Sequence, residues 1–176
     1  MEIWKENSVL YDGKVVRLRV GTVTLDTGVT ALREVVEHPG GVCVIPFTGH
    51  SVILVRQFRI AAGDYVLEAP AGKLEGDEDP AVRAACELEE ETGFRAARLI
   101  PAGKVYSSVG YCSEQIHLFL ALDLEHVGQR LEEDERIELV EMPLEDVRRN
   151  LRAQAFDDGK TAIVLQALLY HLEEAG

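Results

Sequence analysis

The chain has 176 residues, of which 47% are hydrophobic and 28% charged, a composition that fits one compact domain with a buried core better than two small ones. Its 18 Lys and Arg residues stand against 31 Asp and Glu residues, so the formal net charge is −13. That charge repels a phosphate backbone and argues against a sequence-independent nucleic-acid-binding protein, whereas a polyphosphate substrate requires local cations to offset the carboxylates.

Cysteine usage and the N-terminal sequence indicate the compartment. Cys43, Cys86 and Cys112 are an odd number without any C-x-x-C spacing, which argues against a disulfide framework and a zinc knuckle. Residues 1–6 are not a basic region followed by an apolar run, and no stretch approaches the roughly 20 apolar residues that span a bilayer. These features predict a soluble, cytoplasmic protein.

Strand-length runs of β-type residues are frequent in the first two-thirds of the chain. The clearest are residues 14–23, 29–36, 41–47 and 51–58. The Asp26-Thr27-Gly28 turn predicts a hairpin between the first two runs. The short loop Thr48-Gly49-His50 likewise predicts that the third and fourth runs are antiparallel neighbours.

A different periodicity begins at Asp79. Asp suits an N-cap, and Pro80 suits the first helical position because its missing N–H is no loss there. Gly93 stands where a left-handed C-terminal residue is expected. With apolar residues at three- and four-residue spacing, the sequence predicts a helix from Pro80 to about Thr92; the apolar positions are Ala81, Ala84, Ala85 and Leu88.

The remaining elements alternate strands with polar loops. Residues 104–106, 116–124 and 137–142 are predicted strands, and residues 143–153 and 160–174 are predicted helices. The sequence contains no internal repeat and no low-complexity linker. The mixture predicts an α/β sandwich, in which helices cover the faces of a mixed sheet.

Carboxylates crowd the end of the predicted helix at an electrostatic cost. Glu87 and Glu91 are four residues apart and share a face, where like charges repel by roughly 0.2–0.5 kcal/mol per pair. Negative charge at a helix C-terminus costs a further ~0.3–1 kcal/mol. A solvated acidic face is the ordinary explanation of such a run. The flanking glycines at 72, 76 and 93 instead allow backbone carbonyls to approach, and oxygen clusters of this kind suit hard divalent cations.

This segment resembles the Nudix box, G-x5-E-x7-R-E-U-x-E-E-x-G-U, where U is a bulky apolar residue. The spacing matches throughout, at Gly72, Glu78, Glu87, Leu88, Glu90, Glu91, Gly93 and Phe94, whereas Cys86 stands where the family has arginine. The resemblance implies a Nudix-type α/β/α sandwich with a mixed sheet and an N-terminal antiparallel strand region. It implies Mg²⁺ or Mn²⁺ held by Glu87, Glu91 and the Ala71 carbonyl, a supporting catalytic role for Glu90, and a structural one for Glu78.

Segments outside the box resemble the ADP-ribose pyrophosphatase branch of that family. They are residues 33–40, 55–59 and 67–74, and the similarity extends over roughly residues 9–172. It implies hydrolysis of ADP-ribose or a related nucleotide sugar to a nucleoside monophosphate and a sugar phosphate. It also implies a homodimer, in which residues 1–40 contribute to dimerisation and to the substrate site, and residues 41–176 form the hydrolase domain.

The same resemblance suggests residues that contact the substrate or the water. Arg33, Glu34 and Arg59 are candidates for contacts with the nucleotide or terminal ribose, and a surface strand position is the alternative for each arginine. In the acidic loop of residues 131–136, Glu133 is the candidate general base and Glu135 a metal ligand through water. A merely solvated loop is the alternative there, and the choice of base among residues 132–135 stays open.

Two departures from the branch bear on activity. Val109 replaces the signature proline of the segment after the box, which brings other nucleoside-diphosphate sugars into consideration. Cys86 removes an arginine that anchors a glutamate, although Arg83, four residues before Glu87, lies on the same face and is a candidate replacement. We therefore hypothesise weakened or altered activity, which a Cys86→Arg variant with no gain in turnover or metal affinity would argue against.

Two other functions are compatible with a degraded box. One is a non-catalytic or weakly active nucleotide-binding protein, and the other is a house-cleaning nucleoside-triphosphate pyrophosphohydrolase. The box carboxylates are all present, which favours catalysis, and no helix-turn-helix segment indicates a transcriptional regulator. The sequence leaves the preferred substrate, the physiological metal and the oligomeric state open.

Overall fold

The computed structural model describes residues 1–131, 133 and 135–175. The chain divides into two compact units. The first comprises Met1–Gly40 with Tyr106–Gln115, and the second comprises Gly41–Val105 with Ile116–Gly176.

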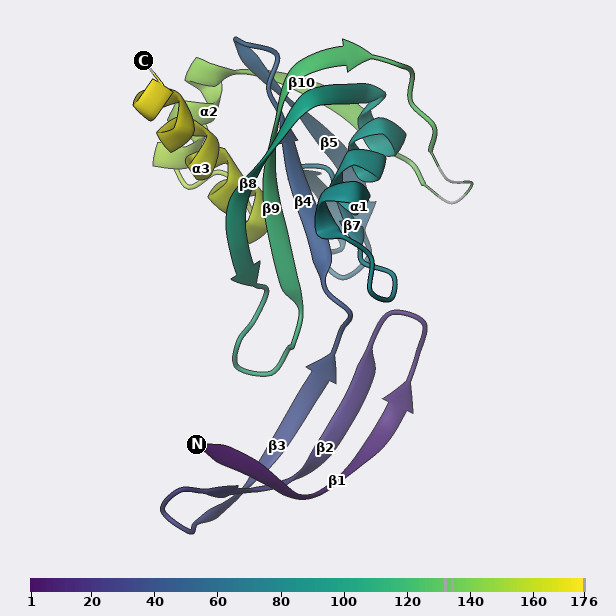
Figure 1. The fold of residues 1–176 in the computed structure, drawn as a ribbon, viewed down its shortest axis with the longest axis vertical. Coiled ribbons are helices and arrows are strands. Elements are labelled where there is room, and N and C mark those ends of the chain that lie inside the picture. Colours follow the sequence, from purple (N-terminus) through teal and green to yellow (C-terminus); the bar gives the residue numbers. More distant parts are fainter. Residues whose placement is uncertain (132, 134, 176) are drawn as a thin grey trace. The chain divides into compact units, whose positions relative to one another are not determined.

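The first unit is a three-stranded antiparallel sheet in the order β1-β2-β3 (Figure 1). Its strands are β1 (Glu2–Asp12), β2 (Arg17–Leu25) and β3 (Thr30–Glu37). The predicted hairpin at residues 26–28 is confirmed, because Thr24 pairs with Thr30 across it and Gly28 adopts a φ of 83°. Strand β1 was not predicted; it covers one edge of this hairpin.

The second unit contains two further sheets. Their strands are β4 (Gly41–Pro46), β5 (Ser51–Arg59), β6 (Asp64–Glu68), β7 (Ala71–Lys73), β8 (Phe94–Tyr106), β9 (Gln115–His126) and β10 (Glu138–Pro143). One sheet has the order β7-β4-β9-β8 and the other the order β10-β5-β6. Strand β4 pairs parallel with β9 and antiparallel with β7, so the four-stranded sheet is mixed, as the sequence predicts.

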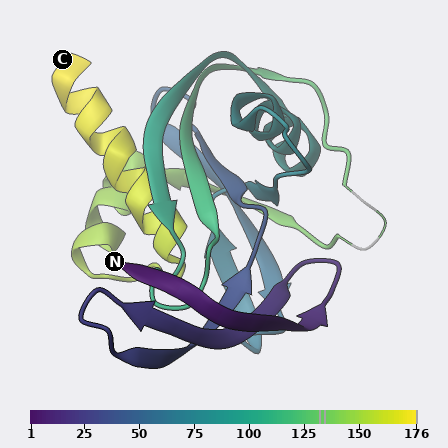
Figure 2. The same ribbon diagram turned by 60° about the horizontal axis from the view of Figure 1, so that its bottom comes forward.

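Alternating side chains of the central strands build a core on each face of the mixed sheet. On β4, Val42 and Val44 pack with Leu88 of the carboxylate-bearing helical segment, whereas Cys43 and Ile45 pack with Leu165 of the C-terminal helix. Figures 1 and 2 show α1 on one side of β4 and β9 and α2 and α3 on the other. The predicted α/β/α sandwich is confirmed. The helices are α1 (Pro80–Glu87), the π-helical turn η1 (Leu88–Thr92), α2 (Leu144–Arg152) and α3 (Gly159–Ala175).

The prediction that residues 41–47 and 51–58 are antiparallel neighbours is wrong. Strands β4 and β5 belong to different sheets and share only a bridge between Phe47 and Val52. Both edges of β4 are already hydrogen-bonded, to β7 and β9, so β5 has no edge to join. The Thr48 turn, in which Thr48 N donates to Ser51 O at 2.9 Å, passes the chain from one sheet to the other.

Several strands differ in length from their sequence signals. Strands β6 and β7 have five and three residues and were not predicted, and β8 begins at Phe94 instead of residue 104. Such short or partly exposed strands depend on their neighbours more than on local periodicity.

In the described part of the chain, no helix has the length and apolar character needed to cross a membrane.

Candidate functional site

The predicted helix over residues 80–92 is confirmed, but its last five residues form a π-helical turn. Asp79 caps the start, since its Oδ1 accepts a hydrogen bond from Ala81 N at 2.8 Å, and Pro80 follows at the first position. Gly93 ends the segment with a φ of 73°. Single π-helical turns within α-helices frequently mark functional sites, and this one carries Glu89, Glu90 and Glu91.

The glutamates of this segment separate into a buried pair and a partly exposed pair. Glu87 is 5% exposed and Glu91 only 3%, so a solvated acidic face does not describe them. The Glu90 side chain is 37% exposed. Glu89 forms ion pairs with Arg95 and Arg130 at 2.6 Å and 3.3 Å, away from the buried pair.

Burial makes the negative charge of the two inner carboxylates unfavourable. Burial, followed by the charge of Glu87, raises the pKa of the Glu91 carboxyl to about 8, although the Ala71 N–H donates to its Oε2 at 3.0 Å. Burial also raises the pKa of the Glu87 carboxyl, more than the Arg83 guanidinium lowers it. The pair therefore favours a proton or a cation as its partner.

Gly72 lies directly beneath the Glu87 carboxylate. A Cβ atom on Gly72 would be 1.5 Å from Glu87 Oε1 and 2.0 Å from its Cδ, so only glycine leaves that space to the carboxylate. Strand β7 thus approaches the helical segment at two adjacent residues, through the Gly72 backbone and through the Ala71 N–H.

Arg83 lies within the cluster, one turn before the position where the box has arginine. Its Nη2 is 2.5 Å from Glu87 Oε1 and 4.0 Å from Glu90 Oε2. Arg83 Nε and Glu78 Oε2 are both buried without a hydrogen-bond partner among the described residues. Cys86 is partly buried and lines a groove with Val82, Glu90 and neighbouring residues, and its thiol carries no positive charge to replace the missing guanidinium.

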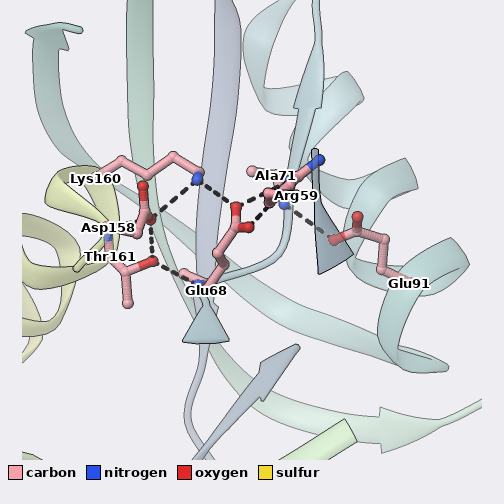
Figure 3. Close-up of polar contacts among 8 residues, drawn as sticks. Arg59, Glu68, Ala71, Glu91, Asp158, Lys160 and Thr161 are labelled. Atoms are coloured by element: carbon pink, nitrogen blue, oxygen red, sulfur yellow. Dashed lines mark hydrogen bonds and ion pairs between the residues drawn. The ribbon is translucent and has the colours of Figure 1, made fainter. Parts of the chain in front are cut away.

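Arg59 reaches the site from β5 as part of a buried ion-pair network that the sequence did not indicate. Its Nε and Nη2 donate to the two oxygens of Glu68 at 2.6 Å and 2.9 Å (Figure 3). Lys160 Nζ donates to Glu68 Oε2 at 2.7 Å and lies 3.0 Å from Asp158 Oδ2. Glu68 is 3% exposed, and the only sequence signal for it was its place in the segment that resembles the pyrophosphatase branch.

The Glu68 network predicts a specific dependence of stability on pH. Burial raises the pKa of the Glu68 carboxyl, but hydrogen bonds and positive charge from Arg59 and Lys160 outweigh it, so this pKa lies below its unfolded value of 4.5. Such a group stabilises the fold above about pH 4.5, and the contribution is lost as the pH falls through the lowered pKa. We expect Glu68→Gln to cost about 3 kcal/mol near neutral pH, because it leaves buried cations without their anion.

Urea unfolding of wild type and Glu68→Gln at neutral pH and at successively lower pH measures this effect. The two free energies of unfolding should converge as the pH falls from 4.5 through the lowered pKa of Glu68. Glu173→Gln is the matched control, since its exposed pair with Arg148 contributes only ~0–1 kcal/mol. A constant difference between wild type and Glu68→Gln at every pH would contradict the prediction.

The acidic loop carries the two remaining glutamate candidates that the structure describes, Glu133 and Glu135. The charge of Glu135 contributes, after burial, to the raised pKa of both Glu87 and Glu91. Glu133 is exposed, and its backbone carbonyl accepts from Arg136 Nη1 at 2.9 Å. Both line a pocket of about 540 Å³ together with Arg56, Tyr65 and other loop residues. The other loop candidates, Glu132 and Asp134, lie outside the described residues.

The remaining candidates belong to the first unit. Arg33 on β3 donates from its Nε to Glu2 Oε2 at 2.9 Å and forms an ion pair with that carboxylate. Glu34, the next residue, is exposed and pairs with Val20 of β2 in the sheet register. Of the candidate residues, the second unit therefore assembles the box residues, Ala71, Arg59 and Glu135.

The donor set of the second unit suits a hard divalent cation. Two buried carboxylates with raised pKa values lie beside strand β7. Among the described residues, no three His, Cys, Asp or Glu side chains converge closely enough to hold a metal ion, and Glu87 is engaged by Arg83 in this arrangement. All available donors are oxygens, which Mg²⁺ and Mn²⁺ prefer over the softer ligands of zinc.

A family model and several known proteins match most of the chain. A family model described as the NUDIX domain matches residues 29–162. The chain is 40% identical to an ADP-ribose pyrophosphatase of Bacillus subtilis over 169 residues, which cover 94% of this chain and 90% of that protein. It is 38% identical to a methanol dehydrogenase activator of Bacillus methanolicus with the same coverage. It is 36% identical to a GDP-mannose pyrophosphatase of Cronobacter sakazakii, over 77% of this chain and 76% of that protein.

A solved structure supports the same fold. The crystal structure of an ADP compounds hydrolase superposes with a TM-score of 0.87 at 21% sequence identity, covering 99% of this chain and 96% of that one. At this identity the match concerns the fold.

Proposed function

Because the chain belongs to the Nudix family and is a hydrolase, we propose that it hydrolyses the pyrophosphate bond of ADP-ribose, giving AMP and ribose 5-phosphate. The observation that carries this proposal is the pair of buried carboxylates, Glu87 and Glu91, at the end of the box helix. Support for the substrate comes from the ADP-ribose pyrophosphatase that is 40% identical over nearly the whole chain.

Mg²⁺ or Mn²⁺ is the proposed cofactor, since Nudix hydrolases generally use divalent metal ions. We assign Glu87, Glu91 and the Ala71 carbonyl as its ligands, with Glu135 acting through water and Glu90 supporting the cluster. When bound, such ions would neutralise the charge of the diphosphate and lower the pKa of a water molecule bound to them.

Two residues of the chain are assigned to binding the phosphate and to activating the water. Arg59 Nη1 donates no hydrogen bond to the described residues while Nε and Nη2 hold Glu68, so Nη1 is available to a phosphate oxygen. Glu133 is exposed on the acidic loop and is assigned as the base that accepts the proton of the attacking water. The water oxygen bonds to one phosphorus, and the bridging P–O bond breaks to release the second phosphate ester.

Residues 1–40 are assigned to dimerisation and to the substrate site of a homodimer. In support, the β1–β3 sheet exposes large apolar side chains and buries few of its own; the exposed ones include Ile3, Leu10, Tyr11, Val29 and Leu32. Arg33 and Glu34 on β3 would then contact the nucleotide or terminal ribose. A cytoplasmic location fits the three free cysteines.

A hydrolysis panel tests the substrate. It contains ADP-ribose, GDP-mannose, other nucleotide sugars, dinucleotides and nucleoside triphosphates, each with Mg²⁺ or Mn²⁺. We expect ADP-ribose to have the highest kcat/KM. GDP-mannose is the second candidate, because Val109 replaces the proline of the ADP-ribose branch and a GDP-mannose pyrophosphatase is 36% identical. Turnover of triphosphates alone would refute the proposal.

Metal binding is expected to raise the melting temperature independently of any substrate. A ligand at about 100 times its Kd adds about 2.7 kcal/mol of stability, which corresponds to roughly 5–10 °C for a chain of this size. Calorimetric melting with Mn²⁺ against a chelator measures the shift. It should shrink strongly in Glu91→Gln and persist in Glu89→Gln. An unchanged melting temperature at millimolar Mn²⁺ would refute the metal assignment.

A further inference from the structure

The first turn of α3 carries a buried polar group that the reaction does not use directly. The Lys160 side chain is 15% exposed and the Asp158 side chain 19%; Lys160 forms ion pairs with both Glu68 and Asp158, so it links the two carboxylates (Figure 3). Burying such ion pairs gains little stability, and well-packed apolar residues commonly do as well or better. A role in stability alone therefore explains this network poorly.

The same turn also holds the backbone that leads into the site. Thr161 is fully buried, and its Oγ1 accepts a hydrogen bond from Ala69 N at 2.7 Å while its hydroxyl donates to Asp158. Two residues further along the chain, Ala71 N donates to Glu91 Oε2 at 3.0 Å. The segment from Ala69 to Ala71 is thus attached to α3 at one end and to the buried carboxylate at the other.

Arg59 is held in place by Glu68, which is itself bound by Lys160. Two parallel hydrogen bonds to Glu68 fix the plane of its guanidinium, and Lys160 restrains Glu68 in turn. The Arg59 side chain remains 44% exposed, so its outer edge is accessible to a ligand. The positive charge of Arg59 lowers the pKa of the Glu91 carboxyl, and the charge of Glu91 raises the pKa of Arg59.

We propose that Asp158, Lys160 and Thr161 are positioning residues of the hydrolytic site. Thr161 sets the Ala69–Ala71 segment and thereby the place of Glu91, and Lys160 sets Glu68 and thereby the direction in which Arg59 faces the diphosphate. The second half of this inference rests on the proposed function, whereas the first half concerns the arrangement of the chain alone.

Hydrogen exchange tests the first half without any substrate. Thr161→Val keeps the shape of the side chain but removes the acceptor of Ala69 N–H, so exchange at Ala69 must accelerate. If α3 positions the segment, exchange at the Ala71 amide accelerates as well, by about tenfold or more, and Thr161→Ser restores both. Continued protection of the Ala71 amide in Thr161→Val would overturn the inference.

Kinetics test the consequence for the reaction. We expect Thr161→Val to lower kcat for ADP-ribose about 10- to 100-fold, the range typical of residues that orient metal ligands, with a smaller change in KM. Lys160→Met, which keeps the length of the side chain and removes its charge, is expected mainly to raise KM, because Arg59 is no longer fixed. Equal kinetic constants in the folded variants and wild type would overturn the positioning role.

A matched control separates positioning from general destabilisation. Arg148→Met removes an ion pair between α2 and Glu173 of α3 and should change neither the Ala71 exchange rate nor the kinetic constants. If Arg148→Met reproduces the effects of Thr161→Val, the inference fails. If wild type hydrolyses no nucleoside diphosphate, the proposed function fails, while the exchange experiment still decides whether α3 positions Ala71.

Discussion

Glu91→Gln is expected to lower kcat about 1,000-fold, equivalent to roughly 4 kcal/mol of transition-state stabilisation. Glu91 is 3% exposed and hydrogen-bonded to Ala71 N, so its carboxylate has a defined place beside Glu87. Gln keeps the shape and still accepts from Ala71, but it removes the negative charge that a cation requires. Lewis-acid assistance of this kind supplies several kcal/mol to hydrolysis.

The same substitution should leave the metal-free fold intact or make it more stable. The pKa of Glu91 is raised to about 8 in the folded chain, above its unfolded value of 4.5. A carboxyl with a raised pKa stabilises the fold at low pH and loses that contribution as the pH rises towards 8. A neutral Gln lacks this penalty, so the free energy of unfolding at about pH 8 should equal or exceed that of wild type.

Steady-state kinetics with ADP-ribose and urea unfolding in chelator measure the two effects. Glu89→Gln is the control, because Glu89 lies two residues away on the same turn and is paired with Arg95 and Arg130. Its kcat should remain within about threefold of wild type, as expected for an exposed ion pair of small energy. A Glu91→Gln enzyme with more than a tenth of wild-type kcat would remove Glu91 from the proposed metal site.

Gly72→Ala is expected to lower kcat/KM about 100-fold or more while costing only about 1–3 kcal/mol of stability. The new Cβ would coincide with the end of the Glu87 side chain, at 1.5 Å from its Oε1. The end of a glutamate side chain moves more easily than a strand, so the carboxylate is displaced and β7 stays in place. A displacement of about 1 Å is sufficient for an effect of this size on a reaction.

A double-mutant cycle establishes whether Gly72 acts through Glu87. Glu87→Ala removes the group that collides with the new methyl, so adding Gly72→Ala to it should change kcat/KM by less than about threefold. If the two residues acted independently, the double variant would lose kcat/KM by the product of the two single losses. Multiplicative losses in the double variant would show that Gly72→Ala acts through the backbone of β7.

The carboxylate helix was predictable because its signals are local. Asp79, Pro80 and Gly93 delimit it, and apolar residues at helical spacing face Val42 and Val44 of β4, as an amphipathic helix requires. The π-helical turn at its end was not predictable from a helical period, since it changes which residues lie above one another. Glu87 and Glu91 are nevertheless both buried.

The ion-pair network around Glu68 could not be predicted from the sequence, because its members are far apart in the chain. Lys160 and Glu68 are separated by 92 residues and meet only when α3 packs against β4 and β6 ends beside it. Arg59 was predicted as a substrate contact, yet two of its three nitrogens are engaged by Glu68. No periodicity or spacing encodes that partnership.

The amino-acid sequence alone determined the family, the helix and the spacing of its glutamates, since these depend on residues within about 20 positions of one another. Tertiary structure decided which of those glutamates are buried, which strand approaches them and which sheet β5 joins. Burial and strand pairing depend on surfaces brought together from distant segments, and burial is the largest cause of the raised pKa of the Glu91 carboxyl. The pattern therefore identified the candidate ligands, and the packing made two of them suited to a cation.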